Sequence, residues 1–214
     1  MLCFERMGMD RDLRTSGLEY DSGKDTARMQ TEVTKKLFTV DEYYQMAAAG
    51  IIGPEERVEL INGEVIQMSP IGDQHAGCVN TANKLLVRAL GDDVVVSVQN
   101  PLQLDNYTEP EPDVVVLKPR PDNYRGKKAR AEDVLWVIEV SDNTLRYDRT
   151  VKVDKYAAAA VPEVWVENLA TDELLVFREP LGSTYAVCLT LKRSDSISPL
   201  AFPNCTFNVQ DLIG

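Results

Sequence analysis

EPDVVVL at residues 111–117 and LWVIEVS at residues 135–141 are the two stretches that decide how this chain folds. Asp113 opens the first apolar run, and Glu139 lies inside the second. Burying an ionised carboxylate without a partner costs several kcal/mol, so such a residue usually has a cation, a hydrogen-bond donor or a catalytic role. The pattern predicts two neighbouring strands that hold Asp113 and Glu139 as a metal site, with a backbone carbonyl near Val140 as a further oxygen.

The sequence around these runs predicts a mixed α/β domain with one central sheet flanked by helices. Thr39 and Glu42 form a capping-box pattern, and Asn62-Gly63 lies between alternating apolar residues, which is a strong hairpin signal. Asp73 is the expected cap of a long helix. The expected helices cover residues 40–49, 73–90 and 147–160, the first hairpin covers 57–68, the strands cover 94–104, 113–118, 134–140 and 164–167, and a trailing hairpin pairs 173–178 with 185–191.

Composition limits the number of domains and the expected partners. The 214 residues are 44% hydrophobic, enough for one ordinary core. The formal net charge is −11, from 34 acidic and 23 basic residues, so the overall charge gives no argument for nucleic-acid binding; it counts mildly against such a partner and does not exclude one. A nuclease could still use a local basic patch or a bound metal ion.

The chain ends and the cysteines add smaller constraints. Residues 1–36 are polar and without hydrophobic period, so we expect a poorly ordered tail before a single domain at 37–214. Met29 opens a more regular stretch and is an alternative translation start. The four cysteines form no CxxC pair and there is a single histidine, which argues against a structural zinc site. No signal-peptide pattern or membrane span is visible, and we expect a cytoplasmic protein.

A third chemical group comes from the helix expected at 147–160. Lys152 and Tyr156 are four residues apart, on one face with Asp148. A lysine beside a metal-bound water can position the nucleophile or stabilise charge on a phosphate. The alternative is a solvated helix with an ordinary Asp148–Lys152 pair, and composition alone favours that alternative.

These segments, together with RVELINGE at 57–64, YDRTVK at 147–152 and VPEVWV at 161–166, resemble the Uma-type family. That family consists of proposed nucleases of the restriction-endonuclease-like, PD-(D/E)XK superfamily. The resemblance covers residues 37–178 with block order and spacing intact. It implies a restriction-endonuclease-like core and a Mg2+-dependent phosphodiesterase site, with Mn2+ as a possible substitute ion.

The resemblance also assigns roles to residues. It makes Asp113 the aspartate of the superfamily's PD pair and Glu139 the acidic residue of the second half-motif. The usual lysine two positions later is absent because Ser141 stands there, and the resemblance implies that Lys152 on the following helix replaces it. The three expected catalytic residues are therefore Asp113, Glu139 and Lys152.

Three further residues are expected to support the site. Glu59 belongs to the family's first block and could be a ligand or orient water, although a solvent-facing hairpin residue is an equal alternative. His75 falls on the apolar stripe of the first long helix, where a lone histidine is more often a hydrogen-bonded core or cap residue than a base. Tyr156 is the third supporting candidate.

Two classes of function remain open from the sequence. The first is a Mg2+-dependent endonuclease acting on DNA, with RNA or nucleotide phosphodiesters as substrates of the same chemistry and a homodimer implied by the resemblance. The second is a non-catalytic binding or assembly module that keeps the fold, which the acidic balance and the displaced lysine favour.

Overall fold

The computed structural model describes residues 34–142 and 147–214 of the chain. Residues 1–33 of the expected tail, including Met29, lie outside the described residues. Lys36–Gly214 form one compact unit, which is described below. None of the helices in the described part has the length and apolar composition needed to cross a membrane.

A six-stranded mixed sheet forms the centre of this unit, which confirms the predicted fold class. All neighbouring strands are antiparallel except β5 and β6, which run parallel. A parallel pair needs a crossover, and here it includes the helical turn η3 (Asp148–Lys152) and α4 (Val153–Ala158). The strands, in spatial order, are β3 (Val95–Val98), β4 (Val114–Leu117), β5 (Val134–Ser141), β6 (Glu163–Asn168), β7 (Glu173–Leu181) and β8 (Thr184–Lys192).

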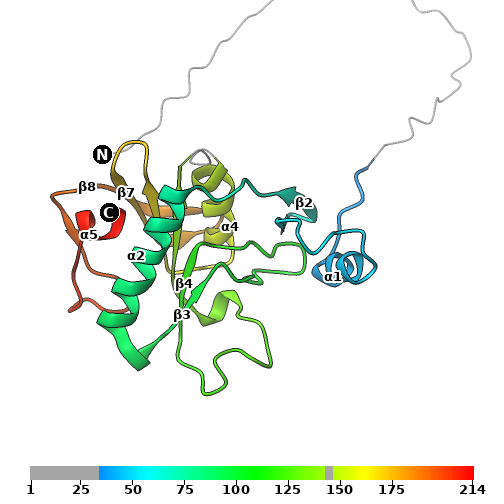
Figure 1. Ribbon diagram of the computed structural model, residues 1–214, viewed down its shortest axis with the longest axis horizontal. Coiled ribbons are helices and arrows are strands. Elements are labelled where there is room, and N and C mark those ends of the chain that lie inside the picture. The colour runs from blue at the N-terminus through cyan, green and yellow to red at the C-terminus, as the bar shows by residue number, and fades with distance from the viewer. Residues whose placement is uncertain (1–33, 143–146) are drawn as a thin grey trace, which may run out of the picture. The chain divides into compact units, whose positions relative to one another are not determined.

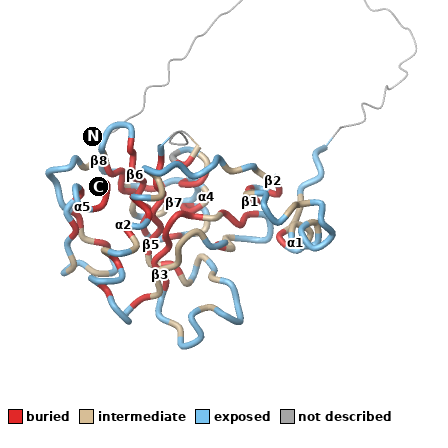
Figure 2. The backbone as a smooth tube through the Cα atoms, in the orientation of Figure 1, coloured by how far each residue is buried: buried red, intermediate tan, exposed pale blue. Residues whose placement is uncertain are grey.

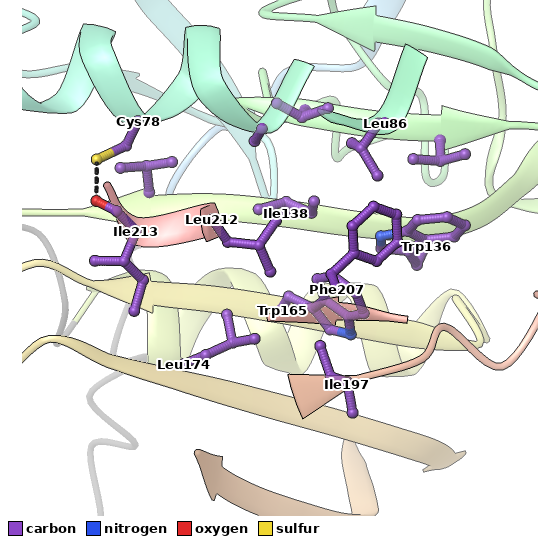
Figure 3. Packing of buried hydrophobic residues seen from close by; sticks show 14 of the residues in the cluster. Cys78, Leu86, Trp136, Ile138, Trp165, Leu174, Ile197, Phe207, Leu212 and Ile213 are labelled. Atoms are coloured by element: carbon purple, nitrogen blue, oxygen red, sulfur yellow. Dashed lines mark hydrogen bonds between the residues drawn. The ribbon is translucent and has the colours of Figure 1, made fainter. Parts of the chain in front are cut away.

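Helices cover both faces of this sheet, and α2 (Asp73–Leu90) lies across one of them in Figure 1. Side chains of β5 alternate between the faces, as expected for a strand. Trp136 and Ile138 pack with α2 and the C-terminal helix α5 (Val209–Ile213), while Val137 packs with Tyr156 of α4. Figure 3 shows the first of these clusters, and Figure 2 shows that the buried residues follow the central strands. Because both faces are covered, Glu139 is buried.

The predicted hairpin forms a separate two-stranded sheet of β1 (Val58–Ile61) and β2 (Glu64–Gln67). Its turn residues Asn62 and Gly63 both have positive φ, at 52° and 74°. That is the conformation that a two-residue hairpin turn requires. Helix α1 (Val40–Ala48) precedes the hairpin and carries the predicted Thr39–Glu42 capping box. Both local predictions are confirmed.

Several boundaries differ from the predictions. Asp73 is the first residue of α2 and Gly72 is the N-cap, so Asp73 is not the cap. The strand expected at 94–104 ends at Val98, because Gln99 has φ 49° and leaves the extended conformation. The last hairpin is longer than expected and belongs to the central sheet. The remaining short elements are η1 (Gly91–Asp93), η2 (Ala131–Asp133), β9 (Ser196–Ile197) and β10 (Phe207–Asn208).

The hairpin turn generates a stability prediction. A Cβ at Gly63 would lie 2.7 Å from Leu37 Cβ, in a backbone conformation that disfavours side chains. Gly63→Ala should therefore lower the free energy of unfolding by about 2 kcal/mol. Gly77 in α2 is the matched control, since its Cβ would meet nothing within 4 Å. Gly77→Ala should raise that free energy by about 0.5–1 kcal/mol. Urea unfolding measures both, and equal effects of the two variants would contradict the turn geometry.

Candidate active site

The central sheet brings the carboxylates of Asp113 and Glu139 together. Val114 of β4 pairs with Ile138 of β5, so Asp113 and Glu139 meet at the same end of the two strands. The Asp113 N–H donates to Glu139 Oε2 at 3.4 Å, and the Val140 N–H donates to Asp113 Oδ2 at 2.8 Å. Asp113 is 9% exposed and Glu139 is 2% exposed. Strand pairing therefore determines the separation of the two groups.

Lys152 approaches the carboxylates from the crossover. Residues Asp148–Lys152 form a turn of π-helix, in which the Val153 N–H donates to the Asp148 carbonyl five residues earlier. Such wide turns occur often at functional sites. Lys152 Nζ lies 3.4 Å from Glu139 Oε1 and 3.2 Å from Glu59 Oε2, and its side chain is 6% exposed. The alternative of a solvated helix with Lys152 at its surface is wrong.

The three supporting candidates also lie at this cluster. Glu59 is 3% exposed and its Oε2 accepts from the Glu111 N–H at 3.2 Å, so the alternative of a solvent-facing hairpin residue is wrong. The Tyr156 hydroxyl donates to Glu139 Oε1 at 2.6 Å. His75, in the first turn of α2, places Nε2 2.7 Å from Asp113 Oδ1. The structure thus groups all six residues singled out in the sequence, and their catalytic roles remain predictions.

Sequence reasoning missed Gln99, which follows β3. Its Nε2 lies 3.4 Å from Asp113 Oδ1 and its N–H donates to the Asp113 carbonyl at 3.1 Å. Gln99 holds φ 49°, and a non-glycine residue in that region marks a locally constrained backbone. No pattern in the sequence predicts the positive φ of Gln99. Gln99 and His75 together restrict the rotation of the Asp113 carboxylate.

A pocket of about 210 Å³ is lined by Glu59, His75, Asp113, Glu139 and Lys152, together with the β2–α2 connection, whereas Gln99 and Tyr156 lie outside its lining. Its permanently charged cations are Arg57 and Lys152. The carboxylates outnumber them: Glu59, Glu111, Asp113, Glu139, Asp142 and Asp148. Four of these carboxylates are buried, namely Glu59, Asp113, Glu139 and Asp148. Such an excess of acidic groups favours binding of a proton or of a metal cation.

The pKa values of the site residues are shifted by burial and by this excess of carboxylates over cations. Burial raises the pKa of Glu139 to about 8, although the Lys152 ammonium acts in the opposite direction. Burial alone would lower the pKa of Lys152, but the surrounding carboxylates, Glu139 and Glu59 first, raise it above its usual value. The hydrogen bond to Asp113 raises the pKa of His75. Without a bound metal ion, the surrounding carboxylates therefore favour the protonated, cationic form of Lys152.

The donor atoms fit a hard divalent cation. Asp113, Glu139 and the Val140 carbonyl offer oxygen, and Mg2+ commonly takes one or two carboxylates while water and substrate phosphate complete its shell. Within the described ranges, no group of three or more His, Cys, Asp or Glu side chains is arranged as a metal cage. Two carboxylates in an acidic pocket are compatible with Mg2+ held partly by substrate and do not match an all-protein zinc cage.

Comparison with known proteins identifies the family and the fold of the chain. The family model described as "Uma2: Putative restriction endonuclease" matches residues 40–210. The chain belongs to the Uma2 family. A similar solved structure is that of "a putative nuclease belonging to DUF820" from Anabaena variabilis, with a TM-score of 0.62 and 15% identity. The match covers 82% of this chain and 97% of that chain, and at this identity it shows a shared fold. A search among curated proteins gave no match.

The predicted resemblance is thereby confirmed, and it extends beyond residues 37–178 to the C-terminal region. In this Uma2 chain, Ser141 is 0% exposed and its hydroxyl has no hydrogen-bond partner among the described residues. Ser141 and Glu139 are two residues apart on β5 and share a sheet face. That is the face against which Tyr156 packs and which Lys152 reaches.

Glu139 generates a prediction for stability against pH. Because its folded pKa of about 8 exceeds its ordinary value of 4.5, the folded protein binds more protons between those values. Its contribution to stability is complete below pH 4.5 and is lost as pH rises through 8. Without divalent metal, the free energy of unfolding should fall by on the order of 3 kcal/mol across this window.

Urea unfolding at several pH values checks this expectation. Glu139→Gln should make the decrease smaller, and the remaining decrease has the same sign because burial also raises the pKa of Glu167 and the Asp113 hydrogen bond raises that of His75. Exposed Glu55 supplies the control Glu55→Gln, which should retain the wild-type profile. A wild-type profile that rises with pH between 5 and 8 would contradict the assignment.

Proposed function

We propose that this chain is a Mg2+-dependent endonuclease that hydrolyses DNA phosphodiester bonds, with residues 37–214 as a single nuclease domain. Membership of the Uma2 family supports a nuclease, and the site supports the chemistry. The observation that carries the proposal is the approach of Lys152 to Glu139 and Glu59 beside Asp113, at the wall of one pocket.

Asp113 and Glu139 would hold the metal ion. A bound Mg2+ would lower the pKa of the attacking water and neutralise charge on the scissile phosphate. His75, Gln99 and the Val140 N–H restrain the Asp113 carboxylate, so little reorganisation is needed for it to act as a ligand.

Lys152 would orient the water and stabilise negative charge that develops on the phosphate. Its raised pKa keeps the ammonium protonated, which suits charge stabilisation. Tyr156 donates to Glu139 Oε1, the oxygen nearest to Lys152, and so fixes the carboxylate between the two groups. Glu59 forms a second ion pair with the Lys152 ammonium, at 3.2 Å.

A non-catalytic binding module is the second candidate function. The ion pairs of Lys152 with Glu59 and Glu139 favour it, because they satisfy the buried lysine without any further partner. Hydrolysis of RNA or nucleotide diesters would use the same groups. A homodimer and a cytoplasmic location remain predictions from the sequence.

Cleavage of supercoiled plasmid and of a 30-base-pair duplex, with Mg2+ or Mn2+, tests the proposal. Asp113→Asn and Lys152→Gln should each lower the rate at least about a hundredfold, since each removes a group that stabilises the transition state. The control Asp92→Asn changes charge by the same amount as Asp113→Asn, at an exposed position on η1 outside the pocket, and should cleave normally. Circular dichroism checks that each variant is folded.

The outcomes separate the candidate functions. Metal-dependent cleavage that is lost in the two site variants supports the endonuclease. DNA binding without cleavage by the wild-type protein would support the binding module, and equal cleavage by all variants would place the activity elsewhere. RNA and dinucleotide substrates in the same assay identify the preferred diester.

A further inference from the structure

Residues 118–130 connect β4 to η2 and contrast in charge with the rest of the chain. This segment, called the basic loop below, contains six basic residues and one acidic residue, a net charge of +5 in a chain of −11. All but three of its residues are exposed. The basic residues are Lys118, Arg120, Arg125, Lys127, Lys128 and Arg130.

Only part of this charge is neutralised within the described part of the chain. Arg120 pairs with Asp122 at 2.6 Å, and Lys128 pairs with buried Glu109 at 3.1 Å. Arg125 and Lys127 are exposed and make no ion pair with any described residue. Only Gly126 separates them in the sequence, so the loop presents both charges close together.

The basic loop is held in shape by its own contacts. The Tyr124 hydroxyl donates to the Lys118 carbonyl at 2.9 Å, and the Arg120 guanidinium lies 4.4 Å from the centre of the Tyr124 ring. The Arg125 N–H donates to the Asp122 carbonyl at 3.0 Å. A loop that is already ordered loses less conformational entropy when it binds a partner. The exposed cations are thus presented on a pre-organised support.

Two connections tie the basic loop to the candidate active site. β4 connects Asp113, which precedes it, to Lys118 at the start of the loop, and these five residue steps span about 17 Å in an extended chain. Near the other end of the loop, Lys128 forms an ion pair with Glu109. Glu109 in turn forms an isolated antiparallel β-bridge with Leu60, the residue after Glu59. Figure 1 shows the loop leaving the sheet at the end of β4.

The segment between Asp113 and Lys118 is as long as several nucleotides of a nucleic acid. A distance of about 17 Å corresponds to about five base pairs along a duplex, at about 3.4 Å for each step. The pocket itself is acidic, and the overall charge repels polyphosphate. Binding a long nucleic acid therefore needs a local group of cations outside the pocket, and the basic loop supplies one.

We propose that the basic loop binds the sugar-phosphate backbone of a nucleic acid several nucleotides from the bond that is cleaved in the pocket. Arg125 and Lys127 contact phosphates, while Tyr124 and Arg120 keep the loop in place. The identity of the partner rests on the proposed nuclease function. Phosphate contacts of this kind position the substrate and do not select its sequence.

Fluorescence anisotropy with a labelled 30-base-pair duplex, in Ca2+ and at several salt concentrations, tests the proposal. The double variant Arg125→Glu, Lys127→Glu should lower the affinity at least about tenfold and reduce the slope of log affinity against log salt by about 2. The matched control is Lys192→Glu, Arg193→Glu, with the same charge change at two exposed positions at the end of β8, the edge strand four strands away from β4. The control should keep the wild-type slope.

Hydrolysis of bis(p-nitrophenyl) phosphate separates this proposal from the proposed function, because so small a diester cannot reach the loop. The loop variant should hydrolyse it at the wild-type rate while cleaving duplex DNA more slowly. Wild-type protein that binds DNA through the loop but hydrolyses neither substrate would overturn the nuclease and leave the loop proposal standing. Unchanged DNA affinity in the loop variant, equal losses in both double variants, or no DNA binding by the wild type would overturn the loop proposal.

Discussion

The burial of one ammonium group among carboxylates is the interaction on which the rest of this structure depends. Lys152 is 5% exposed, and Glu59 and Glu139, which flank it, come from the hairpin and from the central strand β5. Removing one partner of the buried Lys152–Glu59 pair costs about 3–5 kcal/mol, because the other charge is left without compensation. The same contact therefore joins three segments of the chain and concentrates negative charge at one pocket wall.

Sheet topology explains why the lysine can come from the crossover. β5 and β6 are parallel, so the chain must return across one face of the sheet between them. Glu139 and Ser141 point to that face, and the crossover places Lys152 against it. A lysine at position 141 and a lysine on the crossover would thus reach the same region by different routes. The connection between the strands therefore allows a lysine on the crossover to take the place of one at position 141 without a changed fold, which is the role that the resemblance implies for Lys152.

Much of the fold was predictable because the signals are local. The Thr39–Glu42 capping box, the Asn62-Gly63 turn and the apolar runs around Asp113 and Glu139 each depend on a few neighbouring residues, and the structure contains all of them. The placement of Lys152 beside these carboxylates was inferred from the family resemblance, since composition favoured a solvated helix. The match to the family model confirms the resemblance from which this placement was inferred.

What could not be predicted depends on contacts between distant segments. Glu59 is buried because its two-stranded hairpin packs against the site, which a local pattern cannot reveal. Gln99 reaches Asp113 through a backbone conformation that no residue type announces. On β6, Glu167 is buried with no hydrogen-bond partner among the described residues, and burial raises its pKa well above the usual value. A neutral carboxylic acid at that position lowers the cost of its burial.

The central claim is that Asp113 and Glu139 are metal ligands beside a cationic Lys152. Anomalous diffraction from crystals soaked in Mn2+ tests it most directly, because the ion is located independently of any assumed role. The account predicts one anomalous peak in contact with carboxylate oxygens of Asp113 and Glu139, and no such peak in crystals of Asp113→Asn. A peak elsewhere, or none at these carboxylates in the wild-type protein, would contradict it.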